Sequence, residues 1–196
     1  MFRRSPFSPF IAGIALLLIA SPANSQTGTW RAGAWLDIAL DEQGVVTEAV
    51  VVGDVHPALV DSLRDWVTRQ SFTPAEADGQ AVPSTTSVWA TYTLVERDGG
   101  YELEVQNYET APRPIHKEKP AYPRNELLAG NEGWVSLGAT VQPDGKPSDI
   151  RVLESSHRNF EKAAQRAVAK WRFEPETVNG QAVATEVTLQ IEFAIE

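Results

Sequence analysis

Two stretches of this 196-residue chain repeat the same pattern 101 residues apart. Arg69–Val82 and Lys170–Val183 both contain Phe-x-Pro, then four residues, then Gly-Gln-Ala-Val. A shift of 101 residues aligns Trp30–Val95 with Asn131–Glu196 without a gap and leaves eleven identical positions. Self-similarity at a fixed spacing indicates that one structural unit occurs twice.

The two copies share one order of sequence periods. In the second copy, apolar and polar residues alternate over 135–142, which predicts a half-buried strand, and a turn at 143–145 leads to a second strand near 150–153. A helix follows, and the last strand alternates over 187–195. The apolar stripe of that helix consists of Phe160, Ala163, Ala164, Ala167, Val168 and Trp171. The first copy repeats this order, so we predict an α+β fold of two β-β-α-β units, each an antiparallel sheet packed by one helix.

Two segments have no counterpart in the repeat. Asp98-Gly99-Gly100 followed by alternating apolar residues predicts a hairpin appended to the first copy, whose new strand can pair with the edge of the strand at 88–95. Residues 106–123 are rich in proline and predict an extended linker. The expected organisation is a signal peptide at 1–25, the first copy with its hairpin at 26–105, the linker at 106–123 and the second copy at 124–196.

The N-terminus has the pattern of an export signal. Arg3 and Arg4 precede an apolar run over 10–20, and the small residues 23–25 suit a signal peptidase. The run is shorter than the roughly 20 apolar residues of a membrane-spanning helix. We therefore expect cleavage near Ser25 and a periplasmic protein. The alternative, an inner-membrane anchor that is retained and leaves the rest in the periplasm, stays open.

The composition argues against several classes of function. The chain has no cysteine, which excludes disulfides and thiol chemistry. Residues 26–115 contain 5 Lys and Arg against 14 Asp and Glu, and an acidic surface repels nucleic acid and anionic lipid. His56 and His157 occupy the same repeat position at a helix start, which predicts a shared structural or capping role. No metal-ligand spacing, cofactor motif or nucleophile motif is present, so we predict no enzyme and no catalytic, metal or cofactor residues.

Residues 117–196 resemble the C-terminal domain of the TonB energy-transducer family. The resemblance is based on Tyr122-Pro123 before a short helix at 124–129, Gly133-Trp134-Val135 at a strand start, Asp144-Gly145 in a turn, and the helix exit from Ala163 to Pro175. Residues 30–95 look like a degenerate copy that lacks the Tyr-Pro pair.

The resemblance implies a partner and a mode of binding. The family domain adds a strand to a short peptide, the TonB box, of outer-membrane receptors, and it transmits force from an ExbB–ExbD motor. In this chain, the residues expected to bind the partner are Pro120, Tyr122, Pro123, Thr188, Gln190 and Glu192. We expect residues 116–196 alone to bind the receptor peptide, with residues 26–110 unable to do so because the appended hairpin covers their strand edge.

Two features depart from the family pattern. Residues 1–25 contain no histidine for contact with the motor, and the proline-rich stretch is short. Receptor binding for transport is therefore the leading hypothesis, and the sequence leaves open whether the chain couples to ExbB–ExbD and transduces force. The alternative is a structural or assembly adaptor of the cell envelope that transduces no energy. The sequence leaves the receptor and the oligomeric state, including a homodimer, open.

Overall fold

The computed structural model describes residues 29–97 and 100–195, which form two compact units. Of the described residues, unit 1 contains those up to Ala111 and, in addition, Thr177–Gln181. Unit 2 contains Pro112–Glu176 and the residues from Ala182 onward. The expected signal peptide and the turn residues Asp98 and Gly99 lie outside the described residues.

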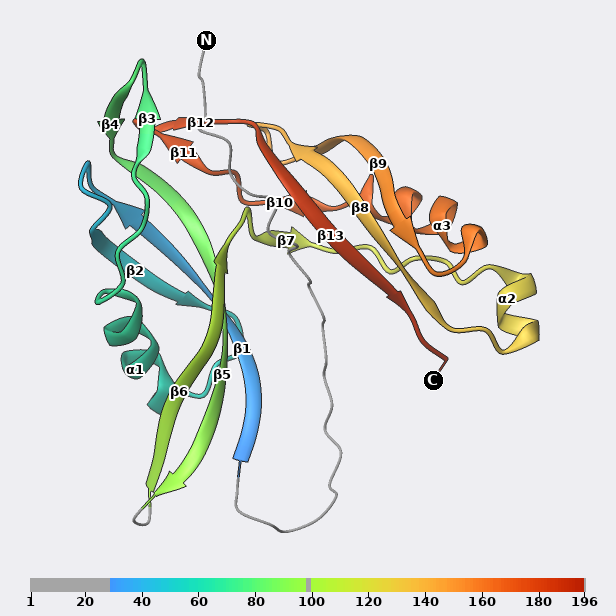
Figure 1. The fold of residues 1–196 in the computed structure, drawn as a ribbon, viewed down its shortest axis with the longest axis horizontal. Helices are drawn as coiled ribbons and strands as arrows, with labels where there is room; N and C mark the ends of the chain where they lie inside the picture. Colours follow the sequence, from blue (N-terminus) through green and yellow to red (C-terminus); the bar gives the residue numbers. More distant parts are fainter. Residues whose placement is uncertain (1–28, 98–99, 196) are drawn as a thin grey trace. The chain divides into compact units, whose positions relative to one another are not determined.

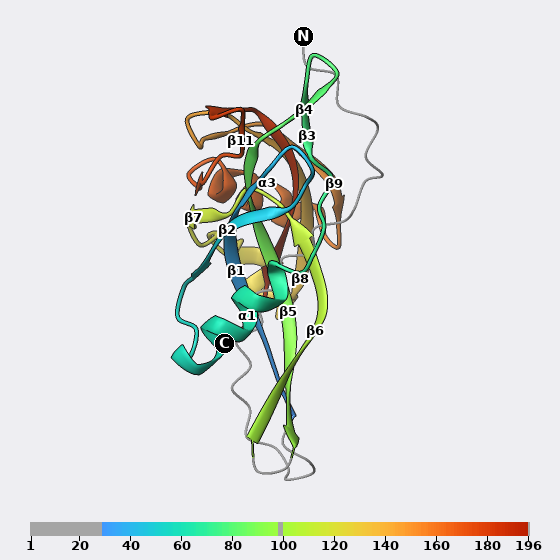
Figure 2. The ribbon, with the colours of Figure 1, turned by 90° about the vertical axis from the view of Figure 1, so that its left-hand side faces the viewer.

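Unit 1 is an antiparallel sheet with one helix on it (Figures 1 and 2). The sheet has the order β12-β11-β5-β1-β2, and β6 also pairs with β5. Its elements are β1 (Thr29–Leu40), β2 (Val46–Val52), α1 (Pro57–Val67), β3 (Ala75–Ala77), β4 (Gln80–Val82), β5 (Ser84–Arg97), β6 (Gly100–Thr110), β11 (Thr177–Val178) and β12 (Gln181–Ala182). The core is formed by the α1-facing residues of β1 and β5 together with Leu63 and Val67 of α1.

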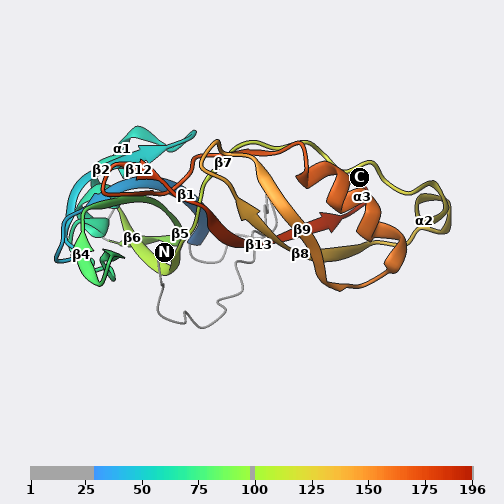
Figure 3. The same ribbon diagram turned by 90° about the horizontal axis from the view of Figure 1, so that it is seen from above.

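Unit 2 has a three-stranded antiparallel sheet of order β13-β8-β9, with α3 packed on β8 and β9 (Figures 1 and 3). A separate two-stranded pair joins β10 to β7. The elements are β7 (Pro114–His116), α2 (Arg124–Ala129), β8 (Gly133–Val141), β9 (Pro147–Ser155), α3 (Arg158–Val168), β10 (Arg172–Phe173) and β13 (Thr185–Phe193). The apolar stripe predicted for the helix is confirmed, because Phe160, Ala164, Ala167 and Val168 are buried and Trp171 is buried just beyond the helix end.

The two units have matching elements at the repeat spacing. Adding 101 to the bounds of α1 reproduces the bounds of α3, and β2 and β9 begin at equivalent residues. The hairpin turns at Asp78-Gly79 and Asn179-Gly180 both have positive φ at their two central residues, as a type I′ turn requires. The mixed α and β content and the antiparallel sheets agree with the predicted fold class.

The proline-rich stretch does not behave as a free linker. Its first five residues, 106–110, continue β6, and four of them, 107–110, pair with β5. Pro114–His116 form β7, which pairs with β10. The stretch is ordered because its backbone groups find partners in both units, so the boundary lies at Ala111 and Pro112 instead of spanning 106–123.

The short hairpin of the second copy differs from the expected arrangement. Thr177 and Val178 of β11 pair with Thr85 and Ser84 of β5, and the Asn179 amide donates to the Pro83 carbonyl at 2.7 Å. The second copy is therefore not formed by one continuous segment, and unit 1 uses part of its chain.

Candidate functional site: the free edge of β13

The last strand of unit 2 is an edge strand. All nine residues of β13 pair with β8, from Thr185 opposite Val141 to Phe193 opposite Gly133. No strand within residues 29–97 and 100–195 pairs with the other side of β13. An unpaired row of amides and carbonyls is a template for an added strand.

The direction of the backbone groups follows from Trp134 on β8. Its carbonyl accepts from the Ser156 amide at 3.0 Å and its amide donates to the Ser156 hydroxyl at 2.8 Å, so both groups face the β9 side. Along a strand, the backbone amide and carbonyl of successive residues point alternately to the two sides. The amides and carbonyls of the odd-numbered residues of β8 therefore point to β13. They bond to the odd-numbered residues of β13 that lie opposite them. The even-numbered residues of β13 therefore point their amides and carbonyls to the free edge.

This alternation selects the residues that the sequence analysis had named. Thr188, Gln190 and Glu192 all belong to the outward set, together with Glu186. The side chains of Thr188 and Gln190 are half-buried and that of Glu192 is exposed. Between them, Val187, Leu189, Ile191 and Phe193 are buried in the core of unit 2. The edge is thus held rigidly by its apolar side chains while half of its backbone groups remain free.

The face of the sheet beside this edge is polar. Arg151 of β9 lies over Gly138, where an added Cβ would approach its guanidinium, and it forms an ion pair with Glu186 at 3.4 Å. Both side chains are more than half exposed, so the pair contributes little stability. Glu192 adds a further negative charge near the end of the edge.

The equivalent strand of unit 1 has no free edge. The 101-residue shift places Ser84–Tyr92 of β5 on Thr185–Phe193 of β13. In β5, β6 covers Val88–Arg97 and β11 covers Ser84 and Thr85. Between these two strands, the Ser87 carbonyl accepts from the Ala111 amide at 3.0 Å. The expectation that the appended hairpin covers this edge is confirmed.

Tyr122 has a core position. Its ring makes edge-to-face contacts with Phe160 and Phe193, at centroid distances of 5.6 and 5.7 Å, and its hydroxyl donates to the Asn131 carbonyl at 2.5 Å. Burial, and secondarily the negative charges of Glu132 and Glu126, raise its pKa. The structure thus places Tyr122 on the core face of β13, opposite the outward side chains.

The two prolines near Tyr122 have local positions in the chain. Pro123 is the N-cap residue of α2, and Pro120 is half-buried in the segment before it. The structure groups Thr188, Gln190 and Glu192 on one edge and does not place Pro120, Tyr122 or Pro123 on that edge.

A carboxylate network that the sequence analysis missed holds α2 against α3. Glu126 is 6% exposed, and its carboxylate accepts hydrogen bonds from the side-chain amides of Asn159 and Asn131. These bonds, first that of Asn159, lower the pKa of Glu126. The signal in the sequence was a charged residue on a short helix, which alone cannot be told from a solvated one.

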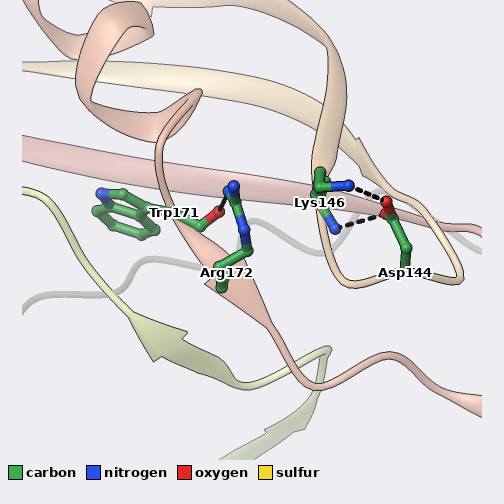
Figure 4. Close-up of polar contacts among 4 residues, drawn as sticks. All are labelled: Asp144, Lys146, Trp171 and Arg172. Carbon is green, nitrogen blue, oxygen red and sulfur yellow. Dashed lines mark hydrogen bonds and ion pairs between the residues drawn. The ribbon is translucent and has the colours of Figure 1, made fainter.

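The segment before α2 is fastened to unit 2 through Trp171. The Trp171 indole donates to the Glu118 carbonyl at 3.0 Å, and the Lys117 ammonium lies 5.5 Å from the ring centroid. Burial lowers the pKa of Lys117. Figure 4 shows the Arg172 guanidinium donating to the Trp171 carbonyl, and the Lys146 amide and ammonium bonded to Asp144 in the β8–β9 turn.

The two histidines do not share one capping role. The His56 imidazole Nδ1 accepts from the Ala58 amide at 3.3 Å and caps α1. His157 makes no capping bond, and its ring instead contacts Phe160 edge-to-face at 5.7 Å. The residue of unit 1 equivalent to Phe160 is Leu59, which has no ring. Within the described residues, no group of three acidic or histidine side chains could hold a metal ion.

Comparison with known sequences identifies the second unit. The profile of the family described as "Gram-negative bacterial TonB protein C-terminal" matches residues 118–195. This segment belongs to the TonB C-terminal domain family. The match includes the whole edge strand β13 and the Tyr122-Pro123 pair.

Individual relatives align with the same TonB domain. Protein TonB of Pseudomonas aeruginosa is 41% identical over 85 residues, which are 43% of this chain and 25% of that protein. Protein TonB of Escherichia coli K12 is 31% identical over 72 residues, or 36% of this chain and 30% of that protein. This chain thus spans about a quarter to a third of the length of these relatives.

A solved structure titled as the TonB C-terminal domain of P. aeruginosa is 42% identical in sequence. The alignment covers 43% of this chain and 86% of that chain, and the TM-score is 0.38.

In the part of the chain that the structure describes, no helix has the length and apolar character needed to cross a bilayer.

Proposed function

We propose that this chain is a periplasmic protein, not an enzyme, and that it binds an extended segment of a TonB-dependent outer-membrane receptor on the free edge of β13. The observation that supports this most directly is the difference between the two units. Equivalent strands have a filled edge in unit 1 and an edge without a paired strand, within the described residues, in unit 2.

The recognition mode follows from the edge itself. The outward amides and carbonyls of Glu186, Thr188, Gln190 and Glu192 would bond the backbone of the guest, and each such bond adds about 0.5–1.5 kcal/mol net. Alternate side chains of the guest would meet the polar face beside Thr188 and Gln190, which supplies selectivity. Tyr122, Pro120 and Pro123 would contribute by supporting β13 from the core side.

The duplication is part of this proposal. Unit 1 would be a second copy of the TonB domain whose guest position is occupied by its own strand β6. It would serve as a spacer or a second interaction module and would not bind receptor peptides by strand addition. Transfer of force from a motor is not part of the proposed role.

The test is an NMR titration of the full mature chain. Peptides with the TonB-box segments of candidate receptors are added to labelled protein, with scrambled peptides as controls. We expect saturable shifts in β13 and the adjoining residues of β8. Shifts confined to unit 1, or none at millimolar peptide, would exclude strand addition at β13 and leave the adaptor role.

Localisation has its own test. We propose export to the periplasm with cleavage near Ser25, so mass spectrometry of the exported protein should show Gln26 as the first residue. A mass that includes Met1 in the membrane fraction would show a retained anchor.

A further inference from the structure

Unit 1 exposes a group of aromatic side chains on the face that bears α1. Trp30, Tyr101 and Tyr108 are 52%, 57% and 41% exposed, and Trp66 is half-buried beside them. They form two edge-to-face pairs, Trp30 with Tyr101 and Trp66 with Tyr108, each with a centroid distance of 5.2 Å. Clustered exposed aromatic residues are typical of interaction surfaces.

A β-bulge brings the two tyrosines to the same face. Tyr101 and Tyr108 are seven residues apart and would face opposite sides of a regular strand. The β5–β6 pairing shifts register so that Val105 lies opposite Tyr92 and Asn107 opposite Thr91, which gives β6 one extra residue. Such an insertion re-aims the side chains that follow it.

Two of these aromatic residues, Trp66 and Tyr101, line a cleft of about 570 Å³ between α1 and β6. Asp65, Trp66 and Arg69 line it from the helix, and Tyr101 and Leu103 line it from the strand. Figure 2 shows the β5–β6 hairpin continuing beyond the end of α1. We call this site the aromatic cleft.

The hydrogen-bonding groups of the cleft favour one kind of ligand. Arg69 Nε donates to the Asp65 carbonyl at 2.8 Å and the Gln70 amide donates to the Trp66 carbonyl at 3.0 Å, so these side chains are turned onto their own helix. The Trp66 indole and the hydroxyls of Tyr101 and Tyr108 form no hydrogen bond with any described residue. In contrast, every buried polar side-chain atom of the described residues has a hydrogen-bond partner. These donors are therefore open to solvent.

Rings with outward donors suit a peptide that stacks its side chains and offers its carbonyls. A polyproline II segment has both properties, because its prolines pack on aromatic rings and its carbonyls have no internal partners. A saccharide would need several converging polar side chains. In the cleft, the side chains of Arg69 and Gln70 are already bonded to carbonyls of α1.

The charge of unit 1 narrows the ligand further. Residues 26–115 contain 5 basic and 14 acidic residues, and the Asp65 carboxylate in the cleft has no hydrogen-bond partner among the described residues. A positively charged ligand would be attracted to this acidic unit, whereas a negatively charged ligand would be repelled by it. We propose that the aromatic cleft binds a proline-rich, basic peptide segment, independently of strand addition at β13.

The test uses the full chain and a peptide of repeated Lys-Pro-Pro triplets, followed by NMR. We expect saturable shifts at Trp66 and Tyr101 and none at β13. Replacing the prolines by alanine, or the lysines by glutamate, should weaken binding several-fold. Equal binding of the alanine peptide, shifts confined to β13 or no binding at millimolar peptide would overturn the proposal.

Matched variants locate the site. Tyr101→Ala should weaken binding about five- to tenfold, as for a central aromatic contact, whereas Val50→Ala, an exposed apolar change on β2, should not. Asp65→Asn should weaken binding more at low salt than at high salt, whereas Asp54→Asn should have a smaller effect. If a chitin-type oligosaccharide shifts the same residues and the peptide does not, the cleft is a saccharide site and the proposal is wrong.

Discussion

The Phe173 amide donates a hydrogen bond to the Gly145 carbonyl at 2.9 Å and fastens the exit of α3 to the β8–β9 turn. Gly145 has a φ of 75°, and a Cβ added there would collide with the Phe173 carbonyl. Unit 1 has the same contact between Phe72 and Gly44, at 3.0 Å and with a φ of 76°. Two of the residue pairs that define the sequence repeat are thus one tertiary contact, made once in each unit.

Gly145→Ala should destabilise unit 2 by about 2–4 kcal/mol, because positive φ costs about 1–2 kcal/mol for a residue with a Cβ and the collision adds to it. Gly130→Ala is the matched control, since Gly130 has a φ of 69° with open space around it. Denaturant unfolding measures both. Equal losses at the two glycines would mean that the contact with Phe173 contributes nothing.

Gln190→Pro should abolish binding of the receptor peptide and leave the sheet largely intact. The Gln190 amide points to the free edge, and proline is tolerated where the missing amide would face solvent. Gln190→Ala, which removes the side chain but keeps the amide, should bind within about threefold of the parent chain, because backbone bonds carry the affinity. Binding that survives proline, or is lost with alanine, would contradict backbone pairing at this residue.

Glu126 should make the stability of unit 2 depend on pH. Hydrogen bonds from Asn159 and Asn131 lower the pKa of Glu126 in the folded state from the ordinary value of 4.5. The stabilisation is therefore complete above that value and is lost as the pH falls through the folded-state pKa. Unfolding of the parent and of Glu126→Gln from pH 6 to pH 3 should show their stabilities converging at low pH. Glu154→Gln, an exposed change on β9, is the control, and a constant gap between parent and Glu126→Gln would contradict the network.

Phe160→Ala should cost about 3–5 kcal/mol, as expected for a large buried aromatic residue. Phe160 is fully buried and its ring stacks on Phe193 with a centroid distance of 4.3 Å. Leu153→Ala is the control, because Leu153 is 51% exposed and should cost only about 0.5 kcal/mol. Thermal unfolding distinguishes the two, and a loss below about 1 kcal/mol at Phe160 would place the core elsewhere.

Local patterns in the sequence were sufficient for the long strands and the helix that the two units share. The period of 3.6 residues defined the buried stripe of α3, and the period of two defined the buried residues of β13, because each depends only on which side of one element meets the core. The same alternation placed Thr188, Gln190 and Glu192 together on one face. The Tyr-Pro pair, the Gly-x-Val start, the Asp-Gly turn and the helix exit together suggested the family of the second unit.

Only the tertiary structure decided which strand edges are filled. A period of two specifies the faces of a strand but not its neighbours, so the sequence could not show that β11 pairs with β5 or that β6 continues to Thr110. It also could not show that Tyr122 packs on Phe193, since that contact joins residues 71 positions apart. The outward direction of the Gln190 amide depends on the pairing of β8 with both neighbours. Pairing is long-range, and it left the edge of β13, within the described residues, without a partner strand.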